Sequence, residues 1–336
     1  MKKIFIILIL VMLFLKIKVV SAVTDSSYIV MDFDSGRVLY EENMHDRFLT
    51  ASIAKIMTAM VAIEEGSLFD YYPVSNNAIN VDGSKIYLEL DDKIMLLDLI
   101  YGLMLRSGND AATLISEVVC DSSNTFIKKM NNLAKRVGMS NSTFQNPTGL
   151  NDDTFNYSTA YDMALLMRYA MNNLVFRDIA TTKTHYVKTL NNSYVWTNKH
   201  KLIHRNNGVI AGKTGYTKLA SRTLVSYAEI NDKKMICVTF NHGDDYKLHE
   251  QLFKKADLEF EETLILKDGV YPQKIKELNY YPKIDEEVRL LVKKNSKIYA
   301  KFILNKKPQD TCGNLEIYED DNLVYKVPIY AYWPIK

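Results

Sequence analysis

Ser52-Ile53-Ala54-Lys55 is the most informative segment of this chain, because two further short motifs follow it in a fixed order. A serine three residues before a lysine on a helix places both side chains on one face, so the amine can reach the hydroxyl without a histidine. Ser107-Gly108-Asn109 adds a second hydroxyl and a carboxamide, and Gly108 is expected to permit the tight turn that projects both side chains away from the neighbouring helices. Lys213-Thr214-Gly215 is typical of a strand that carries a cation and a hydroxyl, with a glycine that admits a substrate backbone. Together the motifs predict an acyl-transferring serine enzyme.

Each motif also has a purely structural interpretation. In that interpretation Ser52 caps a helix, Lys55 is solvated and Lys213-Thr214-Gly215 forms a turn. The order of the motifs and their local contexts favour the enzymatic interpretation. The helix is expected to begin at Thr50 or Ser52 and to end at Gly66. Ser52 then lies in the first turn, where free N–H groups and the helix dipole favour developing negative charge.

Attack of a serine on a peptide carbonyl requires a base and a proton path to the leaving amine. Lys55 can be the base if its pKa is lowered, which burial and a second nearby cation both promote. Lys213 is the expected second cation, and Ser107 can relay a proton to the leaving nitrogen. Asn109 can offer a donor and an acceptor to a substrate amide. The predicted catalytic residues are therefore Ser52, Lys55, Ser107 and Asn109.

The same reaction needs donors for the developing oxyanion and a site for the end of the substrate. The backbone N–H groups of Ser52 and Tyr216 are expected to form the oxyanion hole. Thr214, beside Lys213, is suited to binding a free carboxylate. The predicted substrate-binding residues are therefore Lys213, Thr214 and Tyr216.

The length of 336 residues suggests two domains after removal of a targeting segment. That segment is predicted at residues 1–22: Lys2 and Lys3 precede the apolar run Ile4–Leu15, and Val20-Ser21-Ala22 supplies small residues for cleavage. The protein is therefore expected to be exported to the cell envelope or secreted. The formal charge of +2 and the lack of a dense Lys/Arg block argue against nucleic acid as a partner.

Cysteine and histidine patterns point to no metal or other cofactor. Cys120, Cys237 and Cys312 are odd in number and widely spaced, which is not typical of a disulfide framework or a zinc site. His249-Glu250 lacks a second histidine four residues after the first. No Gly-x-Ser-x-Gly segment occurs, so a Ser-His-Asp hydrolase is disfavoured.

The order of apolar patterns suggests a strand hairpin near the start, then helices over residues 60–180, then strands returning between 194 and 240. Residues 248–260 resemble a closing helix. From residue 265 short alternating runs are separated by Lys/Asn/Asp/Pro turns, which predicts a small all-β domain. The expected domains are residues 23–262 and 263–336.

The chain resembles the D-alanyl-D-alanine carboxypeptidases, the low-molecular-weight penicillin-binding proteins of bacteria, over residues 24–260. The likeness extends beyond the three motifs to longer segments: Thr50–Ala59, Leu105–Ala112, Asn146–Leu150 and Lys213–Thr217. It implies an α/β (α+β) fold. A β-lactamase/transpeptidase-like catalytic domain, with an antiparallel sheet flanked by helices and a helical lobe across a cleft, precedes a small all-β C-terminal domain.

The resemblance also implies a reaction. Ser52 would form the acyl-enzyme, Lys55 would be the base, and Lys213 and Thr214 would bind the terminal carboxylate of a peptidoglycan stem peptide ending in D-Ala-D-Ala. The implied enzyme is a serine-type carboxypeptidase of cell-wall peptidoglycan, with β-lactam antibiotics as covalent inhibitors.

This sequence departs from the family pattern in two places. Ala220-Ser221 stands where relatives have Ala-Gly. The C-terminal amphipathic membrane helix of many relatives is not expected, because residues 327–334 contain two prolines. Tyr216–Lys218 with Arg222–Leu224 also resembles the sporulation-linked branch of the family.

Two alternative functions remain. A class A β-lactamase would carry a Glu-x-x-Leu-Asn segment that supplies the deacylating base, and none is found, including in residues 146–159. A catalytically silent wall-binding protein would be expected to lose one motif, and all are present. The sequence leaves open the exact stem peptide, the oligomeric state, and endopeptidase or transpeptidase action by the same residues.

Overall fold

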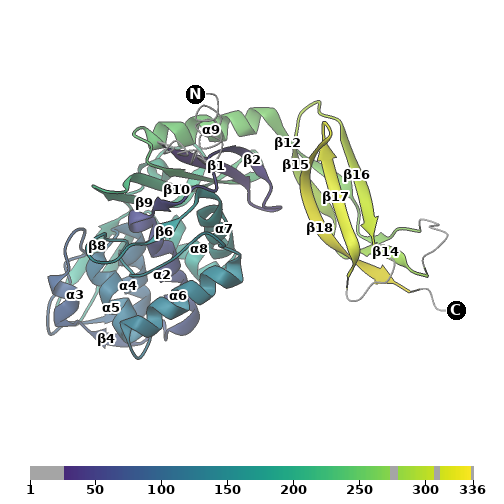
Figure 1. Cartoon of the computed structure of the whole chain (residues 1–336). Coiled ribbons are helices and arrows are strands. Elements are labelled where there is room, and N and C mark those ends of the chain that lie inside the picture. The colour runs from purple at the N-terminus through teal and green to yellow at the C-terminus, as the bar shows by residue number, and fades with distance from the viewer. Residues whose placement is uncertain (1–25, 273–278, 306–310, 334–336) are drawn as a thin grey trace, which may run out of the picture.

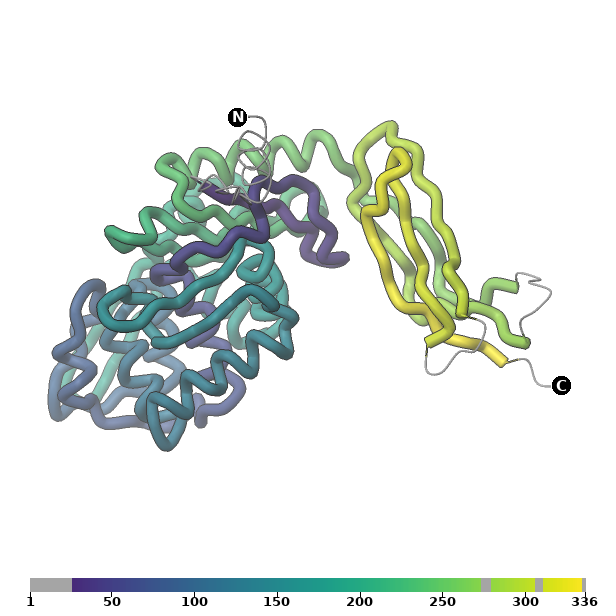
Figure 2. The backbone as a smooth tube through the Cα atoms, in the orientation of Figure 1, coloured from purple at the N-terminus to yellow at the C-terminus, as the bar shows by residue number. Residues whose placement is uncertain are grey.

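The computed structural model describes residues 26–272, 279–305 and 311–333, which form two lobes (Figure 1). The N-terminal lobe comprises residues 26–259 and the C-terminal lobe residues 260–333. The chain passes between them once, at the end of a long helix (Figure 2). The predicted signal sequence at residues 1–22 lies outside the described residues.

An antiparallel five-stranded sheet, in the order β2-β1-β11-β10-β9, forms the centre of the N-terminal lobe. Its strands are β1 (Ser27–Asp32), β2 (Val38–Glu42), β9 (Val209–Thr217), β10 (Ser221–Ile230) and β11 (Lys233–Phe240). Asn231 and Asp232 both have positive φ, which is the conformation of a tight two-residue hairpin turn. This turn fixes the register of β10 against β11.

Helices cover both faces of this sheet (Figure 1). In β1, Ile29 and Met31 pack into the core of the helical region, whereas Val30 points to the opposite face, beneath helix α9 (Asp245–Glu259). The alternation follows from the two-residue period of a strand. Because both faces are covered, β1 reads as an almost unbroken apolar run.

The helical region is built around α2 (Lys55–Glu65), which is buried from Lys55 to Ala62. A helix that is apolar on all sides is stable only when other helices surround it. Those helices are α4 (Leu96–Leu105), α5 (Asn109–Val118), α6 (Ser123–Val137), α7 (Ala160–Met171) and α8 (Leu174–Thr181); α3 (Asn76–Asn80) packs against α5. Short strand pairs complete the lobe: β3 (Phe48–Leu49) with β6 (Tyr157–Ser158), β4 (Tyr71–Pro73) with β5 (Lys93–Met95), and β7 (Thr184–Lys188) with β8 (Ser193–Thr197).

The described part of the C-terminal lobe contains strands and no helix. One sheet pairs β12 (Phe260–Leu266) with β15 (Val288–Lys293); the other has the order β13-β14-β18-β17-β16. The strands of the second sheet are β13 (Gly269–Val270), β14 (Tyr281–Ile284), β16 (Ile298–Leu304), β17 (Thr311–Glu319) and β18 (Asn322–Tyr332). Residues of both sheets share a separate apolar core. The sequence boundary predicted between residues 262 and 263 falls within β12.

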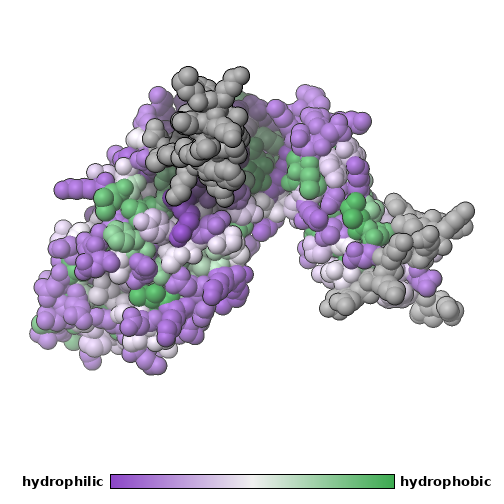
Figure 3. All heavy atoms as spheres, in the orientation of Figure 1, coloured by the Kyte–Doolittle hydropathy of each residue, from purple (hydrophilic) through white to green (hydrophobic). Residues whose placement is uncertain are grey.

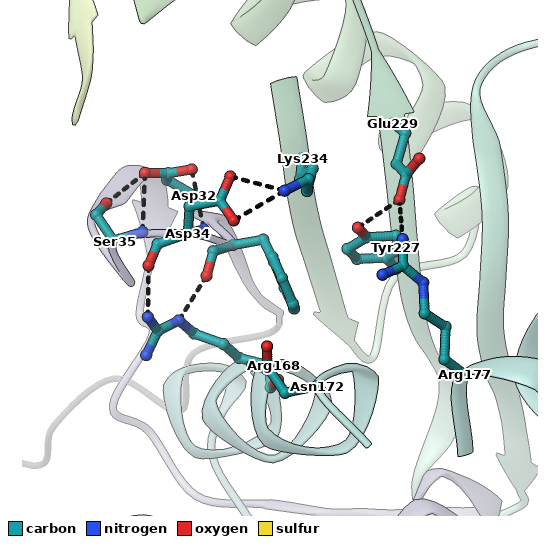
Figure 4. Close-up of polar contacts among 10 residues, drawn as sticks. Asp32, Asp34, Ser35, Arg168, Asn172, Arg177, Tyr227, Glu229 and Lys234 are labelled. Carbon is teal, nitrogen blue, oxygen red and sulfur yellow. Dashed lines mark hydrogen bonds and ion pairs between the residues drawn. The ribbon is translucent and has the colours of Figure 1, made fainter. Parts of the chain in front are cut away.

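The turn between β1 and β2 lies at the junction of the lobes. Arg168 of α7 donates hydrogen bonds to the backbone carbonyls of Phe33 and Asp34, both at 2.6 Å, and Lys234 of β11 pairs with the Asp34 carboxylate (Figure 4). Hydrophobic residues are visible on both lobes near this junction (Figure 3). In the part of the chain described, no helix is long and apolar enough to cross a membrane.

Candidate active site

Ser52 and Lys55 lie where a short 3-10 helix, η1 (Ala51–Ala54), continues into α2. The Lys55 Nζ atom is 3.0 Å from the Ser52 Oγ atom, as the three-residue spacing predicts. The expected α-helical first turn is corrected to a 3-10 turn. Its entry requires Ala51 at φ +46°, which places the Ala51 carbonyl where a Cβ on Gly149 would lie 1.9 Å away, so only glycine fits there.

Lys55 is fully buried, and its amine has three hydrogen-bond partners in the described structure. Besides Ser52, it donates to the Asn109 Oδ1 atom at 2.7 Å and to the Thr148 carbonyl. Burial lowers the pKa of Lys55 to about 7; the Asp110 carboxylate opposes this shift and Lys199 reinforces it. Near neutral pH a substantial fraction of Lys55 is therefore an uncharged amine, which is what a general base for Ser52 requires.

Lys213 is the second buried amine of the site. Its Nζ atom is 2.9 Å from the Ser107 Oγ atom and 2.7 Å from the Thr214 carbonyl. Burial lowers the pKa of Lys213 well below its usual value, and the charges of Lys55 and Lys199 add to the effect. Ser107 thus contacts Lys213, so the Lys213-Thr214-Gly215 motif faces the Ser107-Gly108-Asn109 motif across the cleft.

The geometry of the Ser107 turn differs from the expectation that Gly108 provides the special conformation. Ser107 has φ +64°, whereas Gly108 has φ −59°. Gly108 is required for space instead, because a Cβ there would lie 2.8 Å from the Asp110 carboxylate and 3.0 Å from Ile86. A non-glycine residue in the left-handed region is held only by well-defined surroundings, and such residues cluster at functional sites.

Asn109 connects Lys55 to the loop of residues 82–84. Its Oδ1 atom accepts from Lys55, and its Nδ2 atom donates to the Asp82 carbonyl at 2.6 Å. The Asn109 backbone N–H also donates to the Ser84 carbonyl at 2.7 Å. One lone pair and one N–H of the side-chain amide remain for a substrate. The Asn109 side chain therefore holds the Lys55 amine in place in addition to its expected contact with a substrate.

Strand β9 passes directly over η1 at Gly215. A Cβ on Gly215 would lie 2.9 Å from the Ser52 backbone nitrogen and 2.3 Å from the Thr223 hydroxyl. This close approach brings the N–H of Ser52 and the strand carrying Thr214 and Tyr216 to the same opening. A cleft of about 400 Å³ lies there, lined by Ser52, Ser84, Ser107, Lys199, Lys201, Thr214, Gly215, Tyr216, Arg222, Thr223, Asp245 and Tyr246.

The cleft contains cations that the sequence analysis missed. Lys199 is 3.3 Å from the Ser84 hydroxyl, and burial followed by the charge of Arg106 lowers the pKa of Lys199. Arg222 pairs with Asp245 at 2.6 Å. The hairpin register could have indicated Arg222, because it lies opposite Tyr216. No local pattern marks Lys199, which only the tertiary fold brings to the cleft.

Two further segments of the resemblance have structural roles here. The Asp110 carboxylate accepts hydrogen bonds from the backbone N–H groups of Ile86, Tyr87 and Leu88, and so ties the loop of residues 86–88 to α5. In the other segment, the Asn146 Oδ1 atom accepts from the N–H groups of Thr148 and Gly149, which sets the Thr148 carbonyl against Lys55.

Within the described residues, no group of three or more His, Cys, Asp or Glu side chains is arranged to hold a metal ion. Cys237 and Cys312 are buried, Cys120 is partly buried, and all three are free thiols.

Residues 16–244 match the D-alanyl-D-alanine carboxypeptidase family. The chain belongs to this family. It is similar to D-alanyl-D-alanine carboxypeptidase DacF of Bacillus subtilis, with 32% identity over 240 residues that cover 70% of this chain and 61% of that one. It is also similar to DacC of Escherichia coli, with 32% identity over 231 residues, 65% of this chain and 57% of that one. The matched region thus spans about three fifths of the length of these curated relatives.

Solved structures of D-alanyl-D-alanine carboxypeptidases share the fold. DacD of Francisella tularensis aligns with a TM-score of 0.74 and 25% identity, over 91% of this chain and 92% of that one. A Streptomyces K15 DD-transpeptidase variant aligns with a TM-score of 0.64 and 28% identity, over 69% of this chain and 95% of that one. The predicted fold class, a β-lactamase/transpeptidase-like domain followed by a β domain, is confirmed.

Proposed function

We propose that this chain is a serine-type D-Ala-D-Ala carboxypeptidase, which releases the terminal D-alanine of peptidoglycan stem peptides and is acylated by penicillin. The observation that carries the proposal is the 3.0 Å contact between the Ser52 hydroxyl and the buried amine of Lys55, whose pKa is about 7. Family membership supports the choice of substrate.

In the acylation step Lys55, as the neutral amine, takes the proton of Ser52 while the Ser52 oxygen attacks the carbonyl of the scissile bond. The backbone N–H groups of Ser52 and Tyr216 stabilise the oxyanion. As the tetrahedral intermediate collapses, Ser107 passes a proton to the leaving amine of D-alanine and takes up the proton that Lys55 holds, so that Lys55 is again a neutral amine. Water then attacks the ester, with Lys55 as base, and restores Ser52.

The cations of the cleft favour a substrate with a free carboxylate. Lys213 and Thr214 lie beside the reacting groups, and Lys199 and Arg222 line the same cleft. Since Lys199 has no carboxylate partner among the described residues, an anionic substrate supplies the missing counter-charge.

We further propose that residues 1–22 are a cleaved export signal, and that residues 23–262 and 263–336 are separate domains. Mass analysis of the mature protein from the cell envelope and the medium tests the first part. A mature chain beginning at Val23 is expected, and one that retains Met1–Ala22 contradicts it.

The activity is tested with a peptide ending in D-Ala-D-Ala and with fluorescent penicillin. The wild-type chain should release D-alanine and carry the label on Ser52. Ser52→Ala should lower both activities by at least about three orders of magnitude with the fold retained. Ser67→Ala, at an exposed serine, is the matched control and should behave as wild type.

The products distinguish the rival reactions. A product in which the peptide is joined to an added amine, in place of the hydrolysed peptide, would indicate transpeptidation by the same acyl-enzyme. Covalent labelling of folded Ser52→Ala would overturn the proposal.

A further inference from the structure

A buried chain of hydrogen bonds lies behind the strand that carries Lys213. It joins His200, which precedes the 3-10 helix η2 (Lys201–His204), to Ser226 in β10 and His249 in α9. The His200 Nε2 atom is 2.9 Å from the Ser226 Oγ atom, and the His249 Nδ1 atom is 2.8 Å from the same oxygen. The His249 Nε2 atom is 3.2 Å from the Thr239 hydroxyl.

The direction of each hydrogen bond follows from the one ring proton of each neutral imidazole and the one hydroxyl proton of Ser226. The His200 Nδ1 atom has no hydrogen-bond partner in the described structure. A buried N–H without an acceptor is rarer than a buried lone pair without a donor, so the proton of His200 belongs on Nε2 and is donated to Ser226. Ser226 has one proton, which it donates to His249 Nδ1. The proton of His249 then lies on Nε2 and is donated to Thr239.

This chain of hydrogen bonds contacts Gly212, the residue before Lys213. Ser226 is the register partner of Gly212. A Cβ on Gly212 would lie 2.7 Å from the His200 Nε2 atom, so the imidazole is packed against the Gly212 backbone. Burial lowers the pKa of His200 to about 3, and the charge of Lys213 contributes to the shift. Burial also lowers the pKa of His249 well below its usual value.

We propose that the His200–Ser226–His249 hydrogen-bond network positions Lys213. The network supports strand β9 with hydrogen bonds and keeps the space behind Lys213 free of charge. The proposal rests on the proposed function, in which Lys213 binds the substrate carboxylate. A protonated imidazole behind Lys213 would repel the positive charge with which Lys213 binds the substrate carboxylate. The titratable groups that face the chain are Lys213 from β9, His204 from η2, His242 before α9, and Tyr246 from α9.

The first test uses nitrogen-15 histidine spectra of the wild-type chain between about pH 5 and pH 8, where an ordinary histidine titrates. Signals are assigned with His200→Gln and His249→Gln. Both imidazoles should remain neutral with the proton on Nε2. Titration of either buried imidazole in this range, or a proton on Nδ1 of His200, overturns the proposal. This test holds even if the chain has no carboxypeptidase activity.

The second test measures acylation by a penicillin and by its methyl ester, which lacks the carboxylate. Ser226→Ala should slow acylation by the free acid about tenfold and leave the ester unaffected, because only the acid uses Lys213. In a Lys213→Ala background, Ser226→Ala should cause no further loss. Equal losses with both compounds, or additive losses in the double variant, would show a general structural role and overturn the proposal. If wild type is not acylated, the proposed function itself fails.

Discussion

Arg37 and Glu319 form an ion pair across the junction of the two lobes, with 2.6 Å between a guanidinium nitrogen and a carboxylate oxygen. Only 3% and 12% of the two side chains are exposed. The other terminal nitrogen of Arg37 donates to the Leu291 carbonyl. Leu291 in turn packs with Phe260 in the apolar core beneath α9. The C-terminal lobe is therefore attached to the β1–β2 hairpin by a buried charge as well as by the chain itself.

Glu319→Gln should lower the free energy of unfolding by about 3 kcal/mol, because it leaves the buried charge of Arg37 without its partner. Denaturant unfolding measures the change. Asp285→Asn removes the exposed ion pair of Lys283 with Asp285 and is the matched control, with an expected loss below about 1 kcal/mol. Equal losses of unfolding free energy for the two variants would show that the Arg37–Glu319 pair contributes no more to stability than an exposed ion pair.

A fragment of residues 23–262 should fold and be acylated by penicillin, because every proposed catalytic group lies before residue 220. The fragment should also unfold at a lower temperature than the full chain, since it loses the packing of Leu291 and the partners of Arg37. Thermal unfolding and intact mass after penicillin treatment measure both properties. An insoluble or inert fragment would mean that the C-terminal lobe completes the core.

The rate of penicillin acylation should rise with pH through about 7 and level off above it, because only the neutral form of Lys55 accepts the proton of Ser52. Below that range the rate should fall about tenfold per pH unit as Lys55 becomes protonated. Intact mass at timed intervals gives the rate.

Lys199 provides the control for this pH profile. Its charge contributes to the lowered pKa of Lys55, so Lys199→Gln should move the rise to higher pH, whereas Lys199→Arg should keep it in place. A profile that is flat around neutrality in the wild-type chain would remove Lys55 from the role of base.

The acyl-enzyme formed with penicillin should be long-lived. Its hydrolysis requires a positioned base for water, and the Glu-x-x-Leu-Asn segment of class A β-lactamases is missing from this sequence. Lys55 must then serve both steps, and the bulky penicilloyl group obstructs the approach of water. The decay of the adduct by intact mass checks the expectation. Loss within seconds, with many penicillins hydrolysed per enzyme, would assign the chain to the β-lactamases.

Ser221→Gly should stabilise the protein by about 1 kcal/mol, because Ser221 has φ +56° and glycine adopts this conformation without strain. Denaturant unfolding measures the change. Ser193→Gly, at an exposed strand position without a positive φ, is the control and should be destabilising. A destabilising Ser221→Gly would mean that the serine hydroxyl contributes more than the strain costs.

Much of the fold could be predicted from local patterns. The strand hairpin near the start, the helices between residues 60 and 180, the closing helix near residues 248–260 and the alternating strands of the C-terminal lobe all appear where the patterns place them. The prediction was wrong at Ser107 and Gly108, where the serine takes the left-handed conformation. Glycine usually takes the left-handed conformation, but Gly108 is needed because Asp110 and Ile86 leave no room for a side chain. No local sequence pattern reveals this lack of room.

The sequence by itself determined the candidate reacting groups and their order along the chain. The three-residue spacing from Ser52 to Lys55 sets their contact through helix geometry alone, and the Lys213-Thr214-Gly215 motif predicts a strand. Only the tertiary structure decided the protonation state of the Lys55 amine. The amine of Lys55 is enclosed by Asn109 and Thr148, which are 54 and 93 residues away, and Lys199 comes still later in the chain. The energy of a charge depends on all the atoms and charges around it, and folding assembles those from distant segments.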